Sequence, residues 1–215
     1  MIDSTPIFDI LENRLSVSET RRANGHPAED ICLACGLCCN GAIFADVRLQ
    51  AGDEPARLLG LGLPLRISNR KGEPASNLAG EPSARVQRFR FSQPCAAFDG
   101  CRCRVYDDRP RYCRLFECGV LKSLKAGKIS HRTALRLIRS ARTKADHVRR
   151  LLRNLGDTEE DLPLAKRMGR TSRRLEEIGL ERQAAQVYSK LTLAAHDLNF
   201  LLSEAFYPGH NIHEA

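Results

Sequence analysis

The sequence predicts an α-rich (α+β) protein, in which a small cysteine-stapled domain with a two-stranded hairpin or small sheet precedes an antiparallel three-helix array. Two observations support this prediction. All nine cysteines lie between residues 32 and 118, eight of them in two clusters, and loops there separate two short runs of strand-like alternation. After residue 119, apolar residues recur every three or four positions, the spacing of one helix face. We therefore expect a cysteine-cluster domain at 1–119 and a helical bundle region at 120–215.

Local patterns define the elements of the first domain. Apolar spacing over 5–22 predicts a short helix, and the alternation of 42–49 predicts a strand. Another short helix is expected to end near Leu59, with Asp53 as its N-cap and Pro55 in its first turn.

A Gly- and Pro-rich segment over 64–84 predicts a long loop, and the alternation of 85–91 predicts a second strand that pairs with 43–49. Asp107 or Asp108, followed by Arg109-Pro110, then indicates the start of a further short helix.

Three helices are expected over 130–155, 162–178 and 181–206. Their heptad-like seams and short connections favour antiparallel packing within one chain, with an intermolecular coiled coil as the alternative. Ser130 is the expected N-cap of the first helix, and Asp157 or Thr158 that of the second. The predicted seams are Ile138, Ala141, Ala145, Val148, Leu152 and Leu155; Leu164, Met168, Thr171, Leu175 and Ile178; and Ala184, Val187, Leu191, Ala194, Leu198, Leu201 and Ala205.

The first cysteine cluster has the spacing of metal ligands. Cys32, Cys35 and Cys38 form a Cys-x2-Cys-x2-Cys run, and each Cys-x2-Cys turn brings two sulfurs to one side of a loop. The same run matches the three-ligand segment of a cubane iron–sulfur cluster. Cys39 directly follows Cys38, and because successive side chains diverge, we expect it to reach a second metal or to bridge.

The second cluster supplies the remaining thiols, Cys95, Cys103, Cys113 and Cys118. Eight thiolates suffice for two four-thiolate sites, or for one cluster with redox-active thiols left over. Thiols this dense in a reducing compartment are more often metal ligands than disulfides. We therefore predict that 1–119 is a metal-binding domain that holds an iron–sulfur cluster or zinc, with a slight preference for iron–sulfur. Residues 30–118 are expected to fold poorly without the metal.

Several arginines crowd the second cluster, and Cys113 follows the predicted helix start at Pro110. A helix N-terminus and nearby guanidinium groups both lower the pKa of a thiol. We therefore expect a lowered pKa at Cys113 and a stabilised polyanionic thiolate site.

These residues together resemble a known family. The order Cys-x-x-Cys-Gly-x-Cys-Cys, then Pro-Cys, then Cys-x-Val-Tyr-x-x-Arg-Pro-x-x-Cys-Arg-x-Phe-x-Cys is similar to the YkgJ-like cysteine-cluster proteins, described as zinc- or iron-chelating. Flagellin lysine methylases carry a similar motif. The resemblance covers about residues 32–118 and implies that the eight cysteines are metal ligands, with Arg109 and Arg114 as cofactor-binding residues. Cys101 matches no position, because an extra residue precedes Cys103.

Composition and charge limit the possible functions. No apolar run approaches the ~20 residues of a membrane helix, and the acidic N-terminus does not fit a signal peptide, so we expect a cytoplasmic protein. The net charge of +8 is concentrated in a basic helix at 128–153, which has nine Lys or Arg and one Asp. The helix predicts an anionic partner or, alternatively, a solvated face whose arginines meet acids at 157–161 and 176–181.

Three functions fit these observations: a metal-chelating or redox module that organises a platform for a partner, an iron–sulfur-dependent transferase similar to protein lysine methylases, and a metal-stapled binder of nucleic acid or an acidic protein through 128–153. Other signals are weaker. His210 and His213 have metal-ligand spacing but lie in a terminal tail. Phe44, Phe89 and Phe91 are expected in the core or sheet rather than on a base-stacking surface.

Overall fold

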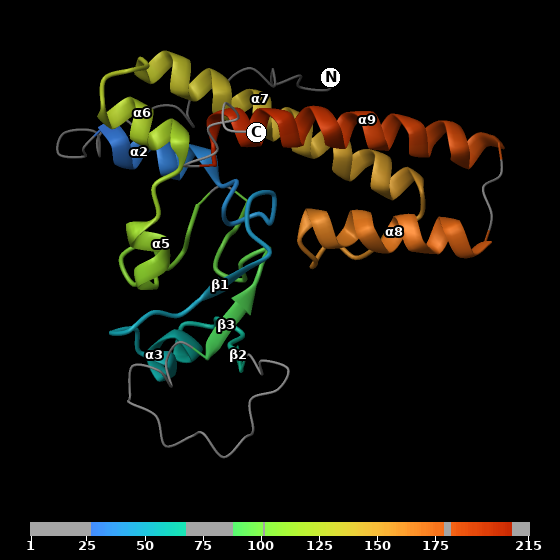
Figure 1. Ribbon diagram of the computed structural model, residues 1–215. Helices are drawn as coiled ribbons and strands as arrows, with labels where there is room; N and C mark the ends of the chain where they lie inside the picture. Colours follow the sequence, from blue (N-terminus) through green and yellow to red (C-terminus); the bar gives the residue numbers. More distant parts are fainter. Residues whose placement is uncertain (1–26, 68–87, 101, 179–181, 208–215) are drawn as a thin grey trace, which may run out of the picture.

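The computed structural model describes residues 27–67, 88–100, 102–178 and 182–207. Within these ranges a small sheet-containing half and a larger helical half meet at the cysteine segments (Figure 1). The predicted α-rich class with a small antiparallel sheet is confirmed. The helix predicted at 5–22, most of the loop predicted at 64–84, Cys101 and the two tail histidines lie outside the described residues.

The sheet has three strands, β1 (Asp46–Arg48), β2 (Arg66–Ile67) and β3 (Phe89–Ser92). Their order is β1-β3-β2, and both pairs are antiparallel. The predicted pairing of the two strand-like runs is confirmed, with Val47 opposite Phe91. β2 lies inside the segment predicted as loop, because a two-residue edge strand is too short to leave a periodic signal.

Helix α3 (Pro55–Gly60) begins with Pro55 in its first turn, as predicted, but its N-cap is Glu54 and not Asp53. The buried Asp53 carboxylate instead accepts hydrogen bonds from the main-chain N–H groups of Gln50 and Arg111, at 2.8 and 2.7 Å. A buried carboxylate is stabilised by such donors. Asp53 therefore ties the loop before α3 to the start of α5 (Arg111–Leu115), the helix that carries Cys113.

The sheet half has its own hydrophobic cluster, which packs between the sheet, α3 and the segment after β3. Three cysteines, Cys95, Cys103 and Cys113, pack against this sheet cluster. Its buried members are Val47, Leu49, Leu58, Leu63, Phe91, Ala97 and Val105.

The helical half consists of α2 (Pro27–Cys35), α6 (Gly119–Lys125), α7 (His131–Asn154), α8 (Leu164–Ile178) and α9 (Arg182–Ala205). The long helix α9 runs antiparallel to α7 and α8, as Figure 1 shows. The segment between α7 and α8 turns back along the molecule, so that the main-chain N–H of Leu164 donates to the Gly41 carbonyl at 3.0 Å. The start of α8 therefore lies beside the first cysteine segment. No helix in the described ranges is long and apolar enough to cross a membrane.

The predicted α7 seam, much of the α9 seam and the first two residues of the α8 seam contribute to the helical core within the chain. All of the α7 seam residues are buried except Leu155, which is half-buried. In α9 the predicted Leu191 and Leu198 are buried, whereas Ala195 and Leu202 are buried in place of the predicted Ala194 and Leu201, because a straight helix repeats every 3.6 residues rather than 3.5. We call this the helical cluster; Cys35 and Cys118 pack against it.

The helix α2 belongs to this helical cluster although it precedes the sheet in the sequence. Its Ile31 and the following Leu37 are buried together with Ile138 of α7 and Phe206 after α9. The two hydrophobic clusters therefore divide the chain at the cysteine segments, while the domain boundary at residue 119 stays a prediction.

One of the two helix caps predicted for the helical half is confirmed. The Ser130 hydroxyl accepts a hydrogen bond from the Thr133 N–H at 3.1 Å, which is the geometry of an N-cap. The prediction that Asp157 or Thr158 caps the next helix is wrong, because α8 begins only at Leu164. The Asp157 carboxylate is buried and accepts a hydrogen bond from the Arg167 guanidinium, with an Nε to Oδ2 distance of 2.7 Å.

The close contact between α6 and the end of α9 leads to a first testable prediction. Gly119 donates its N–H to the Phe206 carbonyl at 2.9 Å, and an added Cβ would lie 2.5 Å from the Ala205 carbonyl oxygen. Because backbone cannot easily yield, we expect Gly119→Ala to destabilise the protein by about 1–3 kcal/mol. Thermal and urea unfolding measure the change.

Gly169→Ala is the matched control, since Gly169 also lies in a helix but nothing lies within 4 Å of an added Cβ. Alanine in a helix interior is favoured over glycine by about 1 kcal/mol, so this variant should be neutral or more stable. Equal stability of the two variants would contradict the close approach of α6 to α9.

Candidate metal centre

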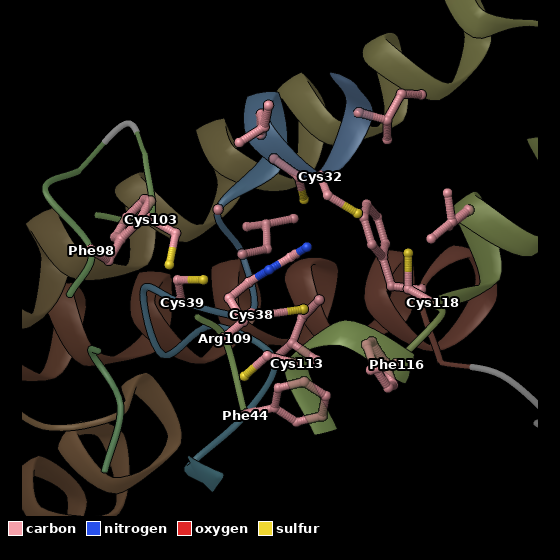
Figure 2. Close-up of a pocket in the computed structure, with 18 of the residues that line it drawn as sticks. Cys32, Cys38, Cys39, Phe44, Phe98, Cys103, Arg109, Cys113, Phe116 and Cys118 are labelled. Atoms are coloured by element: carbon pink, nitrogen blue, oxygen red, sulfur yellow. The ribbon is translucent and has the colours of Figure 1, made fainter. Parts of the chain in front are cut away.

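Seven of the eight predicted metal-ligating cysteines line one cavity at the junction of the two halves, with a volume of about 100 Å³. Figure 2 shows side chains of both sequence clusters around this space. The eighth, Cys95, is outside the lining but adjoins it through Cys39. Among the eight, Cys32 is exposed and the others are half-buried. The lining cysteines are Cys32, Cys35, Cys38, Cys39, Cys103, Cys113 and Cys118.

The first cysteine segment depends on a glycine turn. The helix α2 carries Cys32 and Cys35 and ends at Gly36, whose φ of +66° is disfavoured for other residues. The Gly36 carbonyl then accepts the N–H of Cys39 at 3.0 Å, which folds the chain back. An added Cβ at Gly36 would lie 2.6 Å from the ring of Phe98, so this position also needs a residue without a side chain.

The second cluster reaches the cavity from three short elements. The main-chain N–H of Cys95, after β3, donates to the Cys39 carbonyl at 2.8 Å and so joins the two cysteine segments. Cys103 forms an isolated β-bridge with Phe98. Cys113 lies in the five-residue helix α5, which begins directly after Pro110, and Cys118 is the N-cap residue of α6.

An aromatic cluster forms one wall of the cavity, and the sequence pattern did not indicate it. The ring of Phe44 contacts those of Tyr112 and Phe116 edge-on, with centroids 5.5 and 4.7 Å apart. Such pairs add to the stability that comes from burial alone. Phe91 is buried in the sheet cluster, as predicted, whereas Phe44 lines the cavity.

Arg109 lies among the thiols, and Arg114 does not. The Arg109 guanidinium stacks on the Tyr106 ring, 3.5 Å from its centroid, and its Nε donates to the Tyr106 carbonyl at 2.8 Å. In Figure 2 its side chain extends into the space between the labelled cysteines. Arg114 is exposed on α5 and is not among the cavity-lining residues. Of the two predicted cofactor-binding residues, the structure thus brings only Arg109 to the cavity.

Two arginines of the basic helix hold the first cysteine segment in place. From α7, Arg142 donates to the Ala34 carbonyl at 2.9 Å and Arg149 to the Asn40 carbonyl at 3.0 Å. These carbonyls lie on either side of Gly36, so α7 supports the turn at both ends. Hydrogen bonds from a charged donor are about twice as strong as neutral ones. The charge pattern of 128–153 did not reveal this inward role.

One outer arginine of α7 pairs with an acid as the alternative interpretation of the basic helix expected. Arg153 pairs with Glu160 at 2.9 Å, within the acidic segment after α7. Lys144 likewise pairs with Asp197 of α9 at 3.5 Å. Exposed pairs of this kind contribute little stability. An anionic partner for 128–153 stays a prediction.

Several of the thiols at the cavity have a raised pKa in the metal-free protein. Burial raises the pKa of Cys35, Cys39 and Cys113 to about 12 each, and it raises that of Cys38 well above the ordinary value near 9. The predicted lowering at Cys113 is therefore wrong for the metal-free chain. Arg109 does lower this pKa, but burial and the neighbouring Cys95 and Cys103 outweigh it.

Main-chain N–H groups face several of the sulfurs and favour their thiolate form. The N–H of Leu37 lowers the pKa of Cys35, and those of Ala97 and Phe98 lower that of Cys95, although burial raises both. The N–H groups of Leu121 and Val120 act in the same way on Cys118 at the start of α6. Such donors remain satisfied when a sulfur carries negative charge, and they tune metal–thiolate centres.

The donor chemistry fits a soft metal, because the described cavity lining contains thiols but no carboxylate or imidazole. Over the described ranges, however, no three Cys, His, Asp or Glu side chains are close enough to hold one ion as they stand. Protonated thiols have no cation to draw them together. The cysteines therefore share a cavity without forming a finished ligand shell.

A buried amide adds a polar group that sequence reasoning missed. Gln93 is only 2% exposed and lines the cavity, and its Oε1 has no hydrogen-bond partner among the described residues. A buried carbonyl oxygen without a donor costs about 1–3 kcal/mol. It is thus available to a ligand that carries an N–H or O–H group.

No protein-family model, curated protein or solved structure that we compared matches this chain. The resemblance to the cysteine-cluster family accordingly stays a prediction based on the motif.

The hydrogen bond from Arg149 to the first cysteine segment leads to a second testable prediction. The substitution Arg149→Met removes the donor to the Asn40 carbonyl. We expect the free energy required to open the Gly36 turn to fall by about 1 kcal/mol. If alkylation of Cys38 and Cys39 requires the turn to open, this change in free energy raises their alkylation rate about fivefold. Mass spectrometry of the reduced protein after timed alkylation measures it.

Arg136→Met on the same helix is the control, because Arg136 is exposed and does not line the cavity. It should leave the alkylation rates unchanged. Identical rates in both variants would show that α7 does not hold the turn.

The raised thiol pKa values make a third prediction. Below about pH 9 the thiols are protonated in both the folded and the unfolded chain, so they do not make stability depend on pH. Between about pH 9 and 12 the unfolded chain loses these protons first, so the free energy of unfolding of the reduced, metal-free protein should fall as pH rises.

Urea unfolding of the chelator-treated protein from about pH 8 to about pH 11 measures this dependence. Because burial also raises the pKa of Tyr112, Cys113→Ser serves as the control and should show a shallower fall. The same slope in both proteins would argue against a thiol origin.

Proposed function

We propose that the protein binds a metal centre, an iron–sulfur cluster or zinc, and acts as a metal-chelating or redox module. One observation carries this proposal: thiols from two distant sequence segments gather at one cavity where the described lining offers no oxygen-acid or imidazole ligand. The residues that would hold the metal are Cys32, Cys35, Cys38, Cys39, Cys95, Cys103, Cys113 and Cys118.

Burial of so many thiols supports a metal rather than a purely structural role. Small hydrophobic side chains would fill the junction without the reactivity of cysteine. A bound cation reverses the effect of burial, since it stabilises the thiolate form and displaces the proton. The eight cysteines are all free thiols, so they are available as ligands.

An iron–sulfur cluster is placed before zinc because of the first segment. Cys32 and Cys35 occupy the last turn of α2, and Cys38 follows the Gly36 turn, so that all three face the same cavity. Three thiolates in this spacing are typical of cubane clusters. A cluster of this kind would supply electron transfer, and a reducing cytoplasm would keep its ligands available.

A second function, iron–sulfur-dependent group transfer, is favoured by the unpartnered Gln93 Oε1 in the same cavity. An enzyme keeps an open coordination position for a substrate, whereas a structural or electron-transfer site is closed. Adding imidazole or cyanide while following the electron paramagnetic resonance spectrum separates the two: only an incompletely ligated iron responds.

Anaerobic purification with iron, zinc and sulfide analysis tests the proposed function. We expect iron and acid-labile sulfide in comparable amounts, with broad absorption in the visible range that disappears on chelation. Zinc without iron or sulfide would keep the chelating function but remove redox chemistry. A protein free of all of these metals, even after reconstitution under reducing conditions, would contradict metal binding.

The control variant uses the ninth cysteine. Cys35→Ser should lose metal, because it removes a cavity-lining thiol. Cys101→Ser changes the same residue type at a position that matches no part of the motif, and it should retain the metal. Equal retention in both variants would count against the assigned ligands.

A further inference from the structure

We propose that the eight thiols form two separate four-thiolate centres divided at the peptide bond between Cys38 and Cys39. This inference rests on the proposed function and deepens it, since it states how many metal centres the protein holds. Centre 1 comprises Cys32, Cys35, Cys38 and Cys118. Centre 2 comprises Cys39, Cys95, Cys103 and Cys113.

The first observation is that the cysteines belong to different hydrophobic clusters. Cys35 and Cys118 pack against the helical cluster, whereas Cys95, Cys103 and Cys113 pack against the sheet cluster. The backbone elements follow the same division, since α2 contacts α6 and both contact α7. Five of the eight thiols are thus anchored by one core or the other, and the division between them follows the two sets.

The second observation is which thiols lie near one another. Cys118 acts electrostatically on Cys32, Cys35 and Cys38, all of them members of centre 1. Because such interactions fall off with distance, they identify neighbouring sulfurs.

The same pattern holds for centre 2. The thiols that act most strongly on Cys39 are Cys95, Cys103 and Cys113, and Cys113 itself is influenced by Cys95 and Cys103. Across the divide, Cys39 acts on its chain neighbour Cys38 after Cys35 but before Cys118 and Cys32, and Cys35 acts on Cys39 after the three thiols of its own set. The first cysteine segment therefore contributes three thiols to one set and one to the other.

The backbone explains why Cys39 leaves its sequence neighbours. Its carbonyl accepts the N–H of Cys95, which fixes the second segment beside it. Figure 2 shows the Cys39 sulfur facing Cys103, while Cys32 and Cys118 lie together on the opposite side of the view. Adjacent residues direct their side chains apart, so Cys38 and Cys39 serve different sets.

Positively charged side chains lie beside both sets of thiols. Arg142 donates to the Ala34 carbonyl next to Cys35 of centre 1, and Arg104 donates to the Ala96 carbonyl next to Cys95 of centre 2. Arg109 lines the cavity, and Figure 2 shows its side chain between labelled cysteines of the two sets. A divalent ion with four thiolates carries two negative charges, and a cation between two such centres reduces their repulsion.

Cobalt(II) is a suitable probe, because its thiolate complexes have charge-transfer bands that report ligand type and its tetrahedral sites resemble those of zinc. Titration of the reduced full-length protein under anaerobic conditions should reach its end point at two ions per chain. Cys118→Ser and Cys103→Ser should each lower the tight stoichiometry to one ion.

Double variants make the assignment specific. Cys32→Ser with Cys118→Ser removes two ligands of the same centre and should still leave one tight ion. Cys103→Ser with Cys118→Ser removes a ligand from each centre and should leave none. The wild-type protein provides a readout without substitutions: partial metal loading should protect peptides from alkylation in the two sets of four.

An end point at one ion per chain would overturn the two-centre assignment and leave metal binding intact. So would the loss of all tight metal in Cys118→Ser alone, if circular dichroism shows that this variant retains the fold. Protection of all eight cysteines in parallel in the wild-type protein would overturn it as well, whether or not the variants fold. Absence of any tight cobalt binding would also overturn the two-centre assignment, whereas the proposed function is tested separately by reconstitution with iron, zinc and sulfide.

Discussion

The partial burial of seven thiols at the junction of two hydrophobic clusters is the constraint on which the rest of the structure depends. Thiols whose pKa is raised to about 12 stay neutral, and neutral thiols neither repel nor attract one another strongly. Because such thiols do not draw together, a cavity remains where the two clusters meet. Several polar contacts of the main chain serve to hold the segments around it, including the Asp53 carboxylate at the start of α5 and the Cys95 N–H on the Cys39 carbonyl.

The long basic helix α7 connects the stability of the bundle with the geometry of the site. One face of α7 forms the helical cluster, and Arg142 and Arg149 donate to carbonyls on both sides of the Gly36 turn. A cation close to a thiolate site also offsets negative charge that develops when a metal displaces thiol protons. Some basic residues of this helix therefore support the cysteine segment, while others lie on the solvent-exposed face, where Arg153 pairs with Glu160.

Much of the fold could be predicted because its signals are local. The helical seams, the pairing of β1 with β3 and the Ser130 cap each depend on residues within a short window. The errors arise where a tertiary contact competes with a local preference: Asp53 and Asp157 have the chemistry of caps, but a main-chain donor and a buried guanidinium hold them elsewhere. The candidate site followed the same rule, since cysteine spacing indicated the candidate ligands. Phe44 and Gln93 line the cavity, and Arg149 contacts the first cysteine segment, from positions that no sequence pattern encodes.

The partition of the thiols gives the two proposed centres different structural roles. Every ligand of centre 1 comes from α2, the turn that follows it or the start of α6, so this centre would join elements that already share the helical cluster. Centre 2 takes Cys39 from that same turn but its other three ligands from the sheet half. Metal binding there would connect the two halves, and the energy of thiolate coordination would add to a junction that lacks continuous hydrophobic contact. The vicinal pair Cys38 and Cys39 thus links one centre that strengthens a core to another that joins two cores.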